Sequence, residues 1–229
     1  MKIASFNVQH CNAFLEQRIN YRAIADAILS LDADIVGLNE IYSRGEGVLL
    51  DEQTEVLGAL TGYRYRRFAR AIDFKDGRYG NGFLSKTPIE SSEVIPVPKG
   101  NTAQAHYEDR CLLKVRLEGG ITVLVIHFGL NTDEQENAVR TVLENLADEK
   151  CVLMGDFNIG PDSELLLPIR ERMKDTAELF KAPLLSFPSD RPNCKIDYIF
   201  VSPDVKVISA DIPEIIASDH RPHTAVAEL

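Results

Sequence analysis

The sequence predicts an α/β fold in which mixed β-sheets form the centre and helices cover them from outside. Short apolar runs with the length of buried strands alternate with stretches whose apolar residues recur at helical spacing. The strand-like runs outnumber the helical stretches, and not every strand is followed by a helix, so a regular β-α alternation does not fit. The 229 residues contain no repeat and no linker, and 45% of them are hydrophobic. They are therefore expected to form one domain, residues 1–229, around a sizeable core.

The individual elements follow from these patterns. Strands are expected at residues 3–8, 34–38, 79–85, 110–117, 122–128, 151–155, 196–202 and 224–229. Helices are expected at residues 18–31, 51–60, 133–148 and 163–174. The first helix has one apolar face, formed by Ile19, Ala23, Ala27 and Leu31. For the third helix, Thr132 followed by Gln135 predicts a capping box.

The composition excludes several classes of protein. No apolar run approaches the roughly 20 residues of a membrane-spanning helix, so no membrane partner is expected. The first apolar run is short and interrupted by Ser5 and Asn7, which is unlike a signal peptide and makes the cytoplasm the expected compartment. The four cysteines lie far apart without a Cys-x-x-Cys pair, which favours reduced thiols over disulfides or a zinc cluster.

The charge of the chain bears on its partners. The formal net charge of −10 repels the phosphate backbone of nucleic acid, whose binding is largely electrostatic. Residues 64–78 differ, because six basic residues there face two acidic ones, a local charge of +4 that leaves −14 elsewhere. A solvated edge strand and loop is the favoured interpretation of this basic stretch. The alternative is a positive lip beside an anion-binding site.

The end of one strand-like run after another carries a side chain that binds metals or handles protons. These side chains are Asn7, Glu40, His127, Asp156 with Asn158, and Asp219 with His220. Each one alone has an ordinary explanation, such as a turn or a satisfied core histidine. Five such coincidences at five strand ends indicate a site, because ligands and catalytic groups gather where strand ends converge.

The same residues lie in motifs that resemble the endonuclease/exonuclease/phosphatase superfamily. In chain order the motifs are Phe6-Asn7, Leu38-Asn39-Glu40, Tyr79-Gly80-Asn81-Gly82, Ile126-His127-Phe128, Gly155-Asp156-Phe157-Asn158, Ile196-Asp197-Tyr198-Ile199 and Ser218-Asp219-His220. The resemblance covers essentially the whole chain and implies a four-layer sandwich, two packed mixed β-sheets flanked by helices. Asn39 stands where the family usually has Gln, and Phe6 where it often has Trp. The Trp-Cys-Asp-Arg motif of inositol polyphosphate phosphatases is absent.

The residue types and the resemblance together imply a mechanism. Glu40, with Asn7 and Asp219, offers hard oxygen ligands of the kind that suit Mg²⁺ or Mn²⁺. The resemblance implies that Asp156 is the general base acting on water and that Asn158 fixes this water or a phosphate oxygen.

The remaining roles concern the phosphoryl group. His220 is expected to bond it, with Asp197 holding the other ring nitrogen, and His127 is expected to contact a second oxygen. Asn81 and Arg110 are expected to bind substrate. Glu108 and Arg110 form a Glu-x-Arg pair that could orient His127 or contact substrate, and a structural salt bridge is an interpretation of at least equal weight.

These features predict a divalent-metal-dependent phosphoesterase whose substrate is a phosphate ester, with a phosphodiester favoured. The alternative within enzymes is a DNA or RNA nuclease, which the overall acidity and the single short basic stretch do not favour. A non-catalytic binding module on the same fold would lack ligands or bases, and none is missing here. The natural substrate, the preference for monoester or diester, the number of metal ions and the oligomeric state stay open.

Overall fold

The computed structural model describes the whole chain except residues 45–50, 75–76, 104 and 180–183. Within the described residues, the larger sheet consists of β1 (Lys2–Asn7), β4 (Ile35–Arg44), β5 (Asp51–Glu52), β6 (Tyr65–Phe74), β7 (Gly77–Ser85), β14 (Lys206–Asp211) and β15 (His223–Glu228). Its order is β14-β15-β1-β4-β7-β6, and the short β5 pairs with β4. The sheet is mixed, because β1 runs parallel to β4 and antiparallel to β15.

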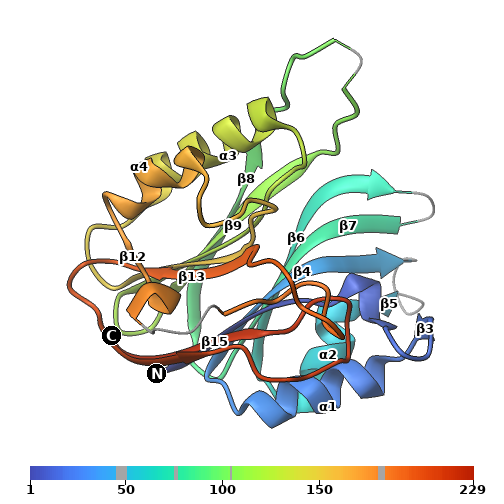
Figure 1. The fold of residues 1–229 in the computed structure, drawn as a ribbon. Coiled ribbons are helices and arrows are strands. Elements are labelled where there is room, and N and C mark those ends of the chain that lie inside the picture. The colour runs from blue at the N-terminus through green and yellow to red at the C-terminus, as the bar shows by residue number, and fades with distance from the viewer. Residues whose placement is uncertain (45–50, 75–76, 104, 180–183) are drawn as a thin grey trace.

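The second sheet lies face to face with the first (Figure 1). Its described strands are β8 (Ile89–Val97), β9 (Arg110–Leu117), β10 (Ile121–His127), β11 (Cys151–Asp156), β12 (Lys174–Asp175) and β13 (Asp197–Val201), in the order β12-β13-β11-β10-β9-β8. It is mixed as well, with β10 and β11 parallel and the other neighbours antiparallel. A small separate pair joins β2 (Asn12–Ala13) to β3 (Arg18–Ile19).

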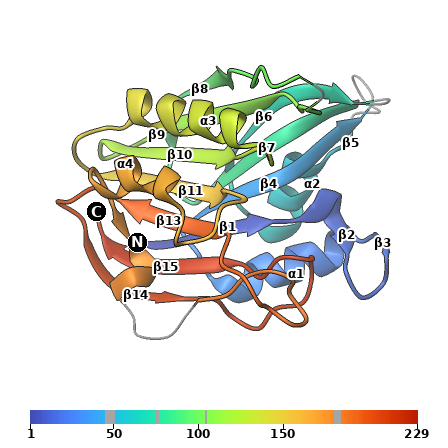
Figure 2. The same ribbon diagram turned by 45° about the horizontal axis from the view of Figure 1, so that its top comes forward.

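Helices cover the outer faces of both sheets, as Figures 1 and 2 show. The first sheet is covered by α1 (Tyr21–Leu31) and α2 (Gln53–Thr61), and the second by α3 (Thr132–Asn145) and α4 (Leu167–Arg170). Three apolar clusters separate these layers, one between the sheets and one under each pair of helices. The expected α/β fold, a four-layer sandwich of two packed mixed β-sheets flanked by helices, is confirmed.

The central strands are apolar on both faces because each face is buried against a different layer. In β10, Val123 and Val125 lie between the sheets, whereas Leu124 and Ile126 pack under α3. Successive side chains of a strand point to opposite faces, so an unbroken apolar run fills two cores at once. This burial fixes the register, since a slip by one residue would exchange the two faces.

The strands that the sequence did not predict lie mainly at sheet edges. Most of β8 and β14 is exposed, and they form one edge of the second and of the first sheet, respectively. Edge strands are often polar, which hides them from a search for apolar runs. Most of the basic stretch lies in β6, the other edge of the first sheet, which confirms the edge-strand interpretation for that part, whereas Arg78 lies in the inner strand β7. Its members Lys75 and Asp76 lie outside the described residues.

The helices start and end differently from the expectation. The first begins at Tyr21, after Asn20 caps it by accepting a hydrogen bond from the Ala23 N–H, and β3 occupies the residues before it. The capping box of α3 uses Asn131 and Glu134, so the pair predicted at Thr132 and Gln135 was wrong by one residue.

The predicted helix at residues 163–174 is broken into a 3-10 turn, Glu164–Leu166, and the single turn of α4. The second of these pieces carries Pro168 in its first turn. Proline has no N–H to donate to the preceding turn, so a helix starting at residue 163 cannot continue through it.

Two expectations from composition can be compared with the structure. All four cysteines are free, and three of them are buried. No helix in the described part of the chain is long and apolar enough to cross a membrane.

Candidate active site

Strand register brings three predicted residues together at one end of the second sheet. His127, the last residue of β10, pairs in register with Asp156, the last residue of β11. Asp156 in turn pairs with Asp197, the first residue of the antiparallel β13. Gly155 allows this close approach, because it has φ of +146° and a Cβ there would lie 1.8 Å from the Ile126 carbonyl oxygen. The glycine of the Gly-Asp-Phe-Asn motif is therefore required by the backbone.

The first sheet contributes Asn7 and Glu40 to the same end. Asn7 ends β1 and lies in register with Asn39 of β4. The pairing of β4 with β7 shifts between Leu38 and Ile41, and Glu40 within this irregularity has φ of 60°. A bulge re-aims a side chain that regular pleating would place elsewhere. Such strain in a non-glycine residue persists where the surrounding structure holds it, often at functional sites.

Buried amides join the two sheets directly behind the site. The Asn39 side chain donates to Asn81 Oδ1 at 2.9 Å and to the Ile126 carbonyl at 3.0 Å, and it accepts from the Asp156 N–H at 2.9 Å. Asn81 in turn donates to the Cys111 carbonyl at 2.9 Å. Asn81 was predicted to bind substrate, yet it is 2% exposed and both its amide groups bond to protein. This placement favours a role in positioning Asp156 over direct contact with substrate.

The centre of the site is a buried group of two aspartates and a histidine. His220 Nδ1 lies 2.8 Å from Asp197 Oδ2, and its other nitrogen, Nε2, lies 3.6 Å from Asp156 Oδ2. Ser186 donates a second hydrogen bond of 2.6 Å to the same oxygen of Asp197. Asp156 also accepts from the Asn158 N–H at 2.9 Å and from Asn7 Nδ2 at 3.1 Å. The predicted contact between Asp197 and His220 is therefore present.

Burial sets the proton affinity of this group. Desolvation, followed by the nearby charge of Asp197, raises the pKa of Asp156. Desolvation alone would lower the pKa of His220, but the charge and hydrogen bond of Asp197, with Asp156 beyond, raise it above that of free histidine. A protonated His220 donates from both ring nitrogens and has no lone pair for a metal ion. Asp156, the carboxylate next to Nε2 of His220, has a raised pKa and is therefore a stronger base than an exposed aspartate.

His127 has the opposite character. Burial, and then the positive charge of Arg110, keep the pKa of His127 well below its usual value. Its Nδ1 lies 3.3 Å from the Arg110 guanidinium, which can only donate, so the ring proton is assigned to Nε2. Nε2 lies 3.5 Å from Asp156 Oδ2 and 3.2 Å from the amide nitrogen of Asn158. Arg110 also pairs with Glu108 at 2.9 Å.

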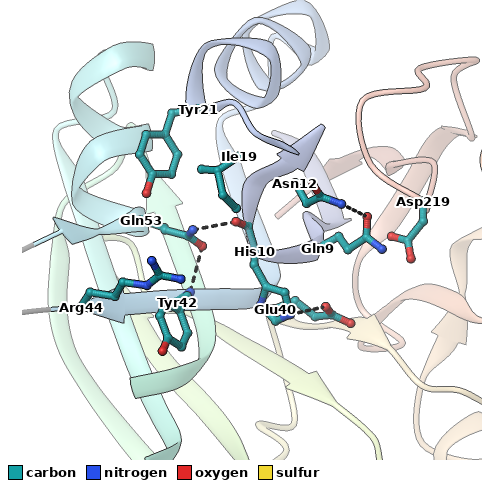
Figure 3. A pocket seen from close by; sticks show the side chains of 10 residues that line it. All are labelled: Gln9, His10, Asn12, Ile19, Tyr21, Glu40, Tyr42, Arg44, Gln53 and Asp219. Carbon is teal, nitrogen blue, oxygen red and sulfur yellow. Dashed lines mark hydrogen bonds and ion pairs between the residues drawn. The ribbon is translucent and has the colours of Figure 1, made fainter. Parts of the chain in front are cut away.

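The buried group opens into a cavity of about 340 Å³, termed here the inner cavity. Its walls include Asp156, Asn158, His127, His220, Glu40, Asp219, His10, Tyr79, Glu108 and Arg110. Glu40 and Asp219 form the outer rim. The Glu40 carboxylate accepts from Asn7 Nδ2 at 3.1 Å and lies 3.4 Å from His10 Nε2, and its side chain is 22% exposed. Figure 3 shows Glu40, Asp219 and His10 in the wall of a neighbouring, larger cavity, which these three residues also line.

Two sets of side chains have the chemistry of a metal site. Ligand atoms of Asp156, Asp197 and His220 all lie within 4.8 Å of one another, but His220 is engaged by Asp197 and favoured in its protonated form. The rim offers hard oxygen atoms on Glu40 and Asp219 that reach the cavity. Magnesium and manganese prefer such oxygen ligands. The donor set at the rim therefore fits a divalent cation better.

Seven of the ten predicted site residues line the inner cavity. Asn7 and Asp197 lie directly behind its wall, where they bond to lining residues, and Asn81 lies further back. As placed, Asn7 donates to both Glu40 and Asp156. Sequence reasoning missed Asn39, His10 and Ser186. Asn39 follows an apolar run, which was a usable signal, whereas Ser186 and His10 lie in irregular segments without any pattern.

The fold and the site define a family. The chain belongs to the endonuclease/exonuclease/phosphatase family, whose model matches residues 4–220. A curated relative is YbhP of Escherichia coli K12, described as an uncharacterized protein, which is 25% identical over 252 residues covering 100% of this chain and 96% of the relative.

Solved structures share the fold. An endonuclease/exonuclease/phosphatase from Beutenbergia cavernae aligns with a TM-score of 0.81 at 22% identity, covering 100% of this chain and 71% of that one. A mannosyl-6-phosphatase from Bacteroides thetaiotaomicron aligns with a TM-score of 0.78 at 17% identity, covering 100% of both chains. These TM-scores show that the chain shares the four-layer architecture of both proteins.

Proposed function

We propose that this protein is a divalent-metal-dependent phosphoesterase that hydrolyses phosphate esters through a water molecule activated by Asp156. The observation that supports this proposal most strongly is the position of Asp156. Its carboxylate faces the inner cavity between a histidine favoured in its charged form, His220, and the oxygen-rich rim at Glu40. Phosphoryl transfer requires a base for the attacking water, positive charge at the phosphoryl oxygens and ligands for a metal ion, and Asp156, His220 and the rim at Glu40 offer these around one cavity.

Asp156 is the proposed general base. Its raised pKa makes the carboxylate more basic than an exposed aspartate, and a base is most effective when its pKa approaches the operating pH. Asn7 and the Asn158 N–H hold the carboxylate in one orientation. A water in the inner cavity that donates to Asp156 is thereby oriented for attack on phosphorus.

Three side chains neutralise the phosphoryl oxygens in this proposal. His220 carries a positive charge, maintained by Asp197, and its Nε2–H points toward the cavity side of Asp156. His127 donates from Nε2 as a neutral imidazole, since Arg110 occupies Nδ1. Arg110 lines the cavity and adds a fixed positive charge, with Glu108 holding one end of the guanidinium. Preorganised donors of this kind stabilise developing charge more than mobile water does.

Glu40 and Asp219 are the proposed ligands of Mg²⁺ or Mn²⁺, with Asn7 holding Glu40 in place. A bound divalent ion supplies charge neutralisation at the phosphoryl oxygens and at the leaving oxygen. A panel of phosphate esters assayed with Mg²⁺, with Mn²⁺ and with excess chelator tests the proposal. We expect turnover of bis(p-nitrophenyl) phosphate with metal and its loss with chelator, and full turnover in chelator would contradict a metal requirement.

A phosphodiester remains the proposed substrate, and the mannosyl-6-phosphatase activity named for one structural relative makes a sugar monoester the first alternative to assay. Long nucleic acid is not favoured. Arg66 pairs with Glu55 and Arg70 pairs with Asp73 on the edge strand β6, and neither arginine lines the inner cavity. We expect little retention of duplex DNA at physiological salt. Tight binding with a steep salt dependence, removed by neutralising these arginines, would favour the nuclease instead.

A further inference from the structure

A second and larger cavity opens on the other side of the rim. It has a volume of about 680 Å³ and is termed here the outer cavity. Its walls are formed by Gln9, His10, Asn12, Ile19, Tyr21, Glu40, Tyr42, Arg44, Gln53 and Asp219, as Figure 3 shows. Three of these, His10, Glu40 and Asp219, also line the inner cavity, so the two spaces meet at the proposed metal ligands. Cavities of roughly 300–1,000 Å³ are the usual size of small-molecule sites.

The position of the outer cavity relates it to the leaving group. In phosphoryl transfer the attacking and leaving oxygens lie roughly in line, on opposite sides of phosphorus. Asp156, the proposed base, lines only the inner cavity, whereas Glu40 lines both. A phosphoryl group attacked from the Asp156 side therefore directs its leaving alcohol across the rim, into the outer cavity.

Three neutral amide side chains, those of Gln9, Asn12 and Gln53, line the outer cavity. Gln9 Oε1 accepts from Asn12 Nδ2 at 3.3 Å, and within the described residues Gln9 Nε2 and Asn12 Oδ1 have no protein partner. Gln53 differs, because it donates to the His10 carbonyl at 2.7 Å and accepts from the Tyr42 N–H at 2.9 Å, which fixes the shape of the wall. An amide offers a donor and an acceptor, which matches the hydroxyl group.

The aromatic ring of Tyr42 is a poor stacking surface for a nucleobase. Tyr42 is 5% exposed, and the guanidinium of Arg44 lies 4.8 Å from its ring centroid, so this ring offers no open face for stacking.

We propose that the outer cavity binds the leaving alcohol of the substrate and that this alcohol is a neutral, hydroxyl-rich group such as a sugar or polyol, recognised by Gln9 and Asn12. This inference rests on the proposed function, since it assumes that the phosphoryl group occupies the inner cavity. Gln53 acts as a positioning residue, because it holds His10 and Tyr42 in the cavity wall.

The test compares esters that differ in their hydroxyl groups alone. The monoester pair is sorbitol 6-phosphate and hexyl phosphate, and the diester pair is bis(glyceryl) phosphate and dipropyl phosphate, assayed with Mg²⁺ and Mn²⁺. We expect the hydroxylated member of at least one pair to have a kcat/KM about tenfold higher, given a roughly two- to tenfold gain for each hydrogen bond. Equal values within both pairs, or a preference for the plain alkyl esters, would overturn the inference.

Variants assign the preference to the outer cavity. Asn12→Ala should reduce the hydroxyl preference by roughly two- to tenfold, mainly through KM, and Gln9→Ala provides a second variant if the first does not fold. Gln17→Ala is the matched control, because this exposed amide lies in the connection that follows β2, the strand of Asn12, and lines neither cavity. A preference that survives both cavity variants, or falls equally with Gln17→Ala, would contradict the assignment.

If bis(p-nitrophenyl) phosphate is hydrolysed while the matched pairs show no preference, the proposed function stands and this inference fails. If no ester including bis(p-nitrophenyl) phosphate is hydrolysed, the proposed function fails with it.

Discussion

The two sides of the inner cavity are built in different ways. On the inner side, Asp156, Asp197 and His220 are 2%, 0% and 5% exposed, and His220 bonds to Asp197 at 2.8 Å and lies 3.6 Å from Asp156. On the rim, Glu40 is 22% exposed, and its contacts are Asn7 and the nearby His10. Burial shifts pKa values and fixes orientation, as proton transfer requires. A partly exposed carboxylate is accessible to a hydrated cation, as metal binding requires. The contrast supports the proposed division, with proton transfer on the inner side and metal binding on the rim.

The largest expected effect comes from removing the base on the inner side. Asp156→Asn keeps the shape of the side chain but cannot accept a proton, so kcat should fall by roughly 10²- to 10⁴-fold. Steady-state kinetics and circular dichroism measure activity and folding together. The matched control is Asp162→Asn, an exposed aspartate in the loop that follows β11. A variant within a few-fold of the parent would show that Asp156 is not the base.

On the rim, a substitution should change the metal response first. Glu40→Gln removes a charged ligand while its partner Asn7 remains, so the Mg²⁺ concentration for half-maximal activity should rise by about tenfold or more, since a charge close to a cation is worth about 1–4 kcal/mol. Metal titrations of activity provide the measurement. Glu16→Gln, an exposed glutamate paired with Arg18, is the control. An unchanged metal titration curve together with a reduced kcat would show that Glu40 acts in the chemical step and does not bind the metal.

A smaller effect is expected from the partner of His220. Asp197→Asn removes the charge that keeps the pKa of His220 raised, so that pKa should fall and activity should drop by roughly tenfold or more. The imidazole signals in an NMR titration report the pKa directly. Ser186→Ala, which removes one hydrogen bond to Asp197 and keeps its charge, should lower activity less. An unmoved His220 pKa would mean that the two side chains are apart in solution.

The smallest expected effect is on the pH dependence of the free energy of unfolding, through the buried histidines His223 and His127. Burial, and then the charge of Lys195, lower the pKa of His223 to about 4, and the same direction holds for His127. In the unfolded chain both titrate near 6.5, so below that pH the unfolded state binds more protons and the folded state loses stability. The free energy of unfolding should fall by about 1 kcal/mol per histidine for each pH unit between roughly 6.5 and 5.

Urea unfolding at pH 5 and pH 7 checks this dependence. His223→Gln removes one of these contributions, so the stability lost between pH 7 and pH 5 should be smaller in the variant than in the parent by about 1.5–2 kcal/mol. Asp156 and His220 contribute in the opposite direction, because their folded-state pKa values are raised, but they do so in parent and variant alike, so the difference between the two proteins reports His223. An identical slope in parent and variant would show that His223 is charged in the folded protein.

The sequence alone was enough to predict the central strands of both sheets. Strands β1, β10, β11, β13 and β15 are buried apolar runs, and such runs are local features that can be read without knowing the partner strand. The residues that end these runs identified nearly all of the inner side, because strand ends that share one edge of a sheet bring their side chains together. The family motifs gave the four-layer order.

Tertiary structure decided the features that depend on distant partners. The edge strands β8 and β14 are too polar to stand out, since they are defined by the neighbour with which they pair. Asn81 could not be assigned from its motif, because its role depends on Asn39, 42 positions away, and on the facing sheet. Asn39 reaches Asp156 across 117 positions. Local patterns carry no information on such contacts, so the amide bridges and the outer cavity became visible only once the two sheets were packed.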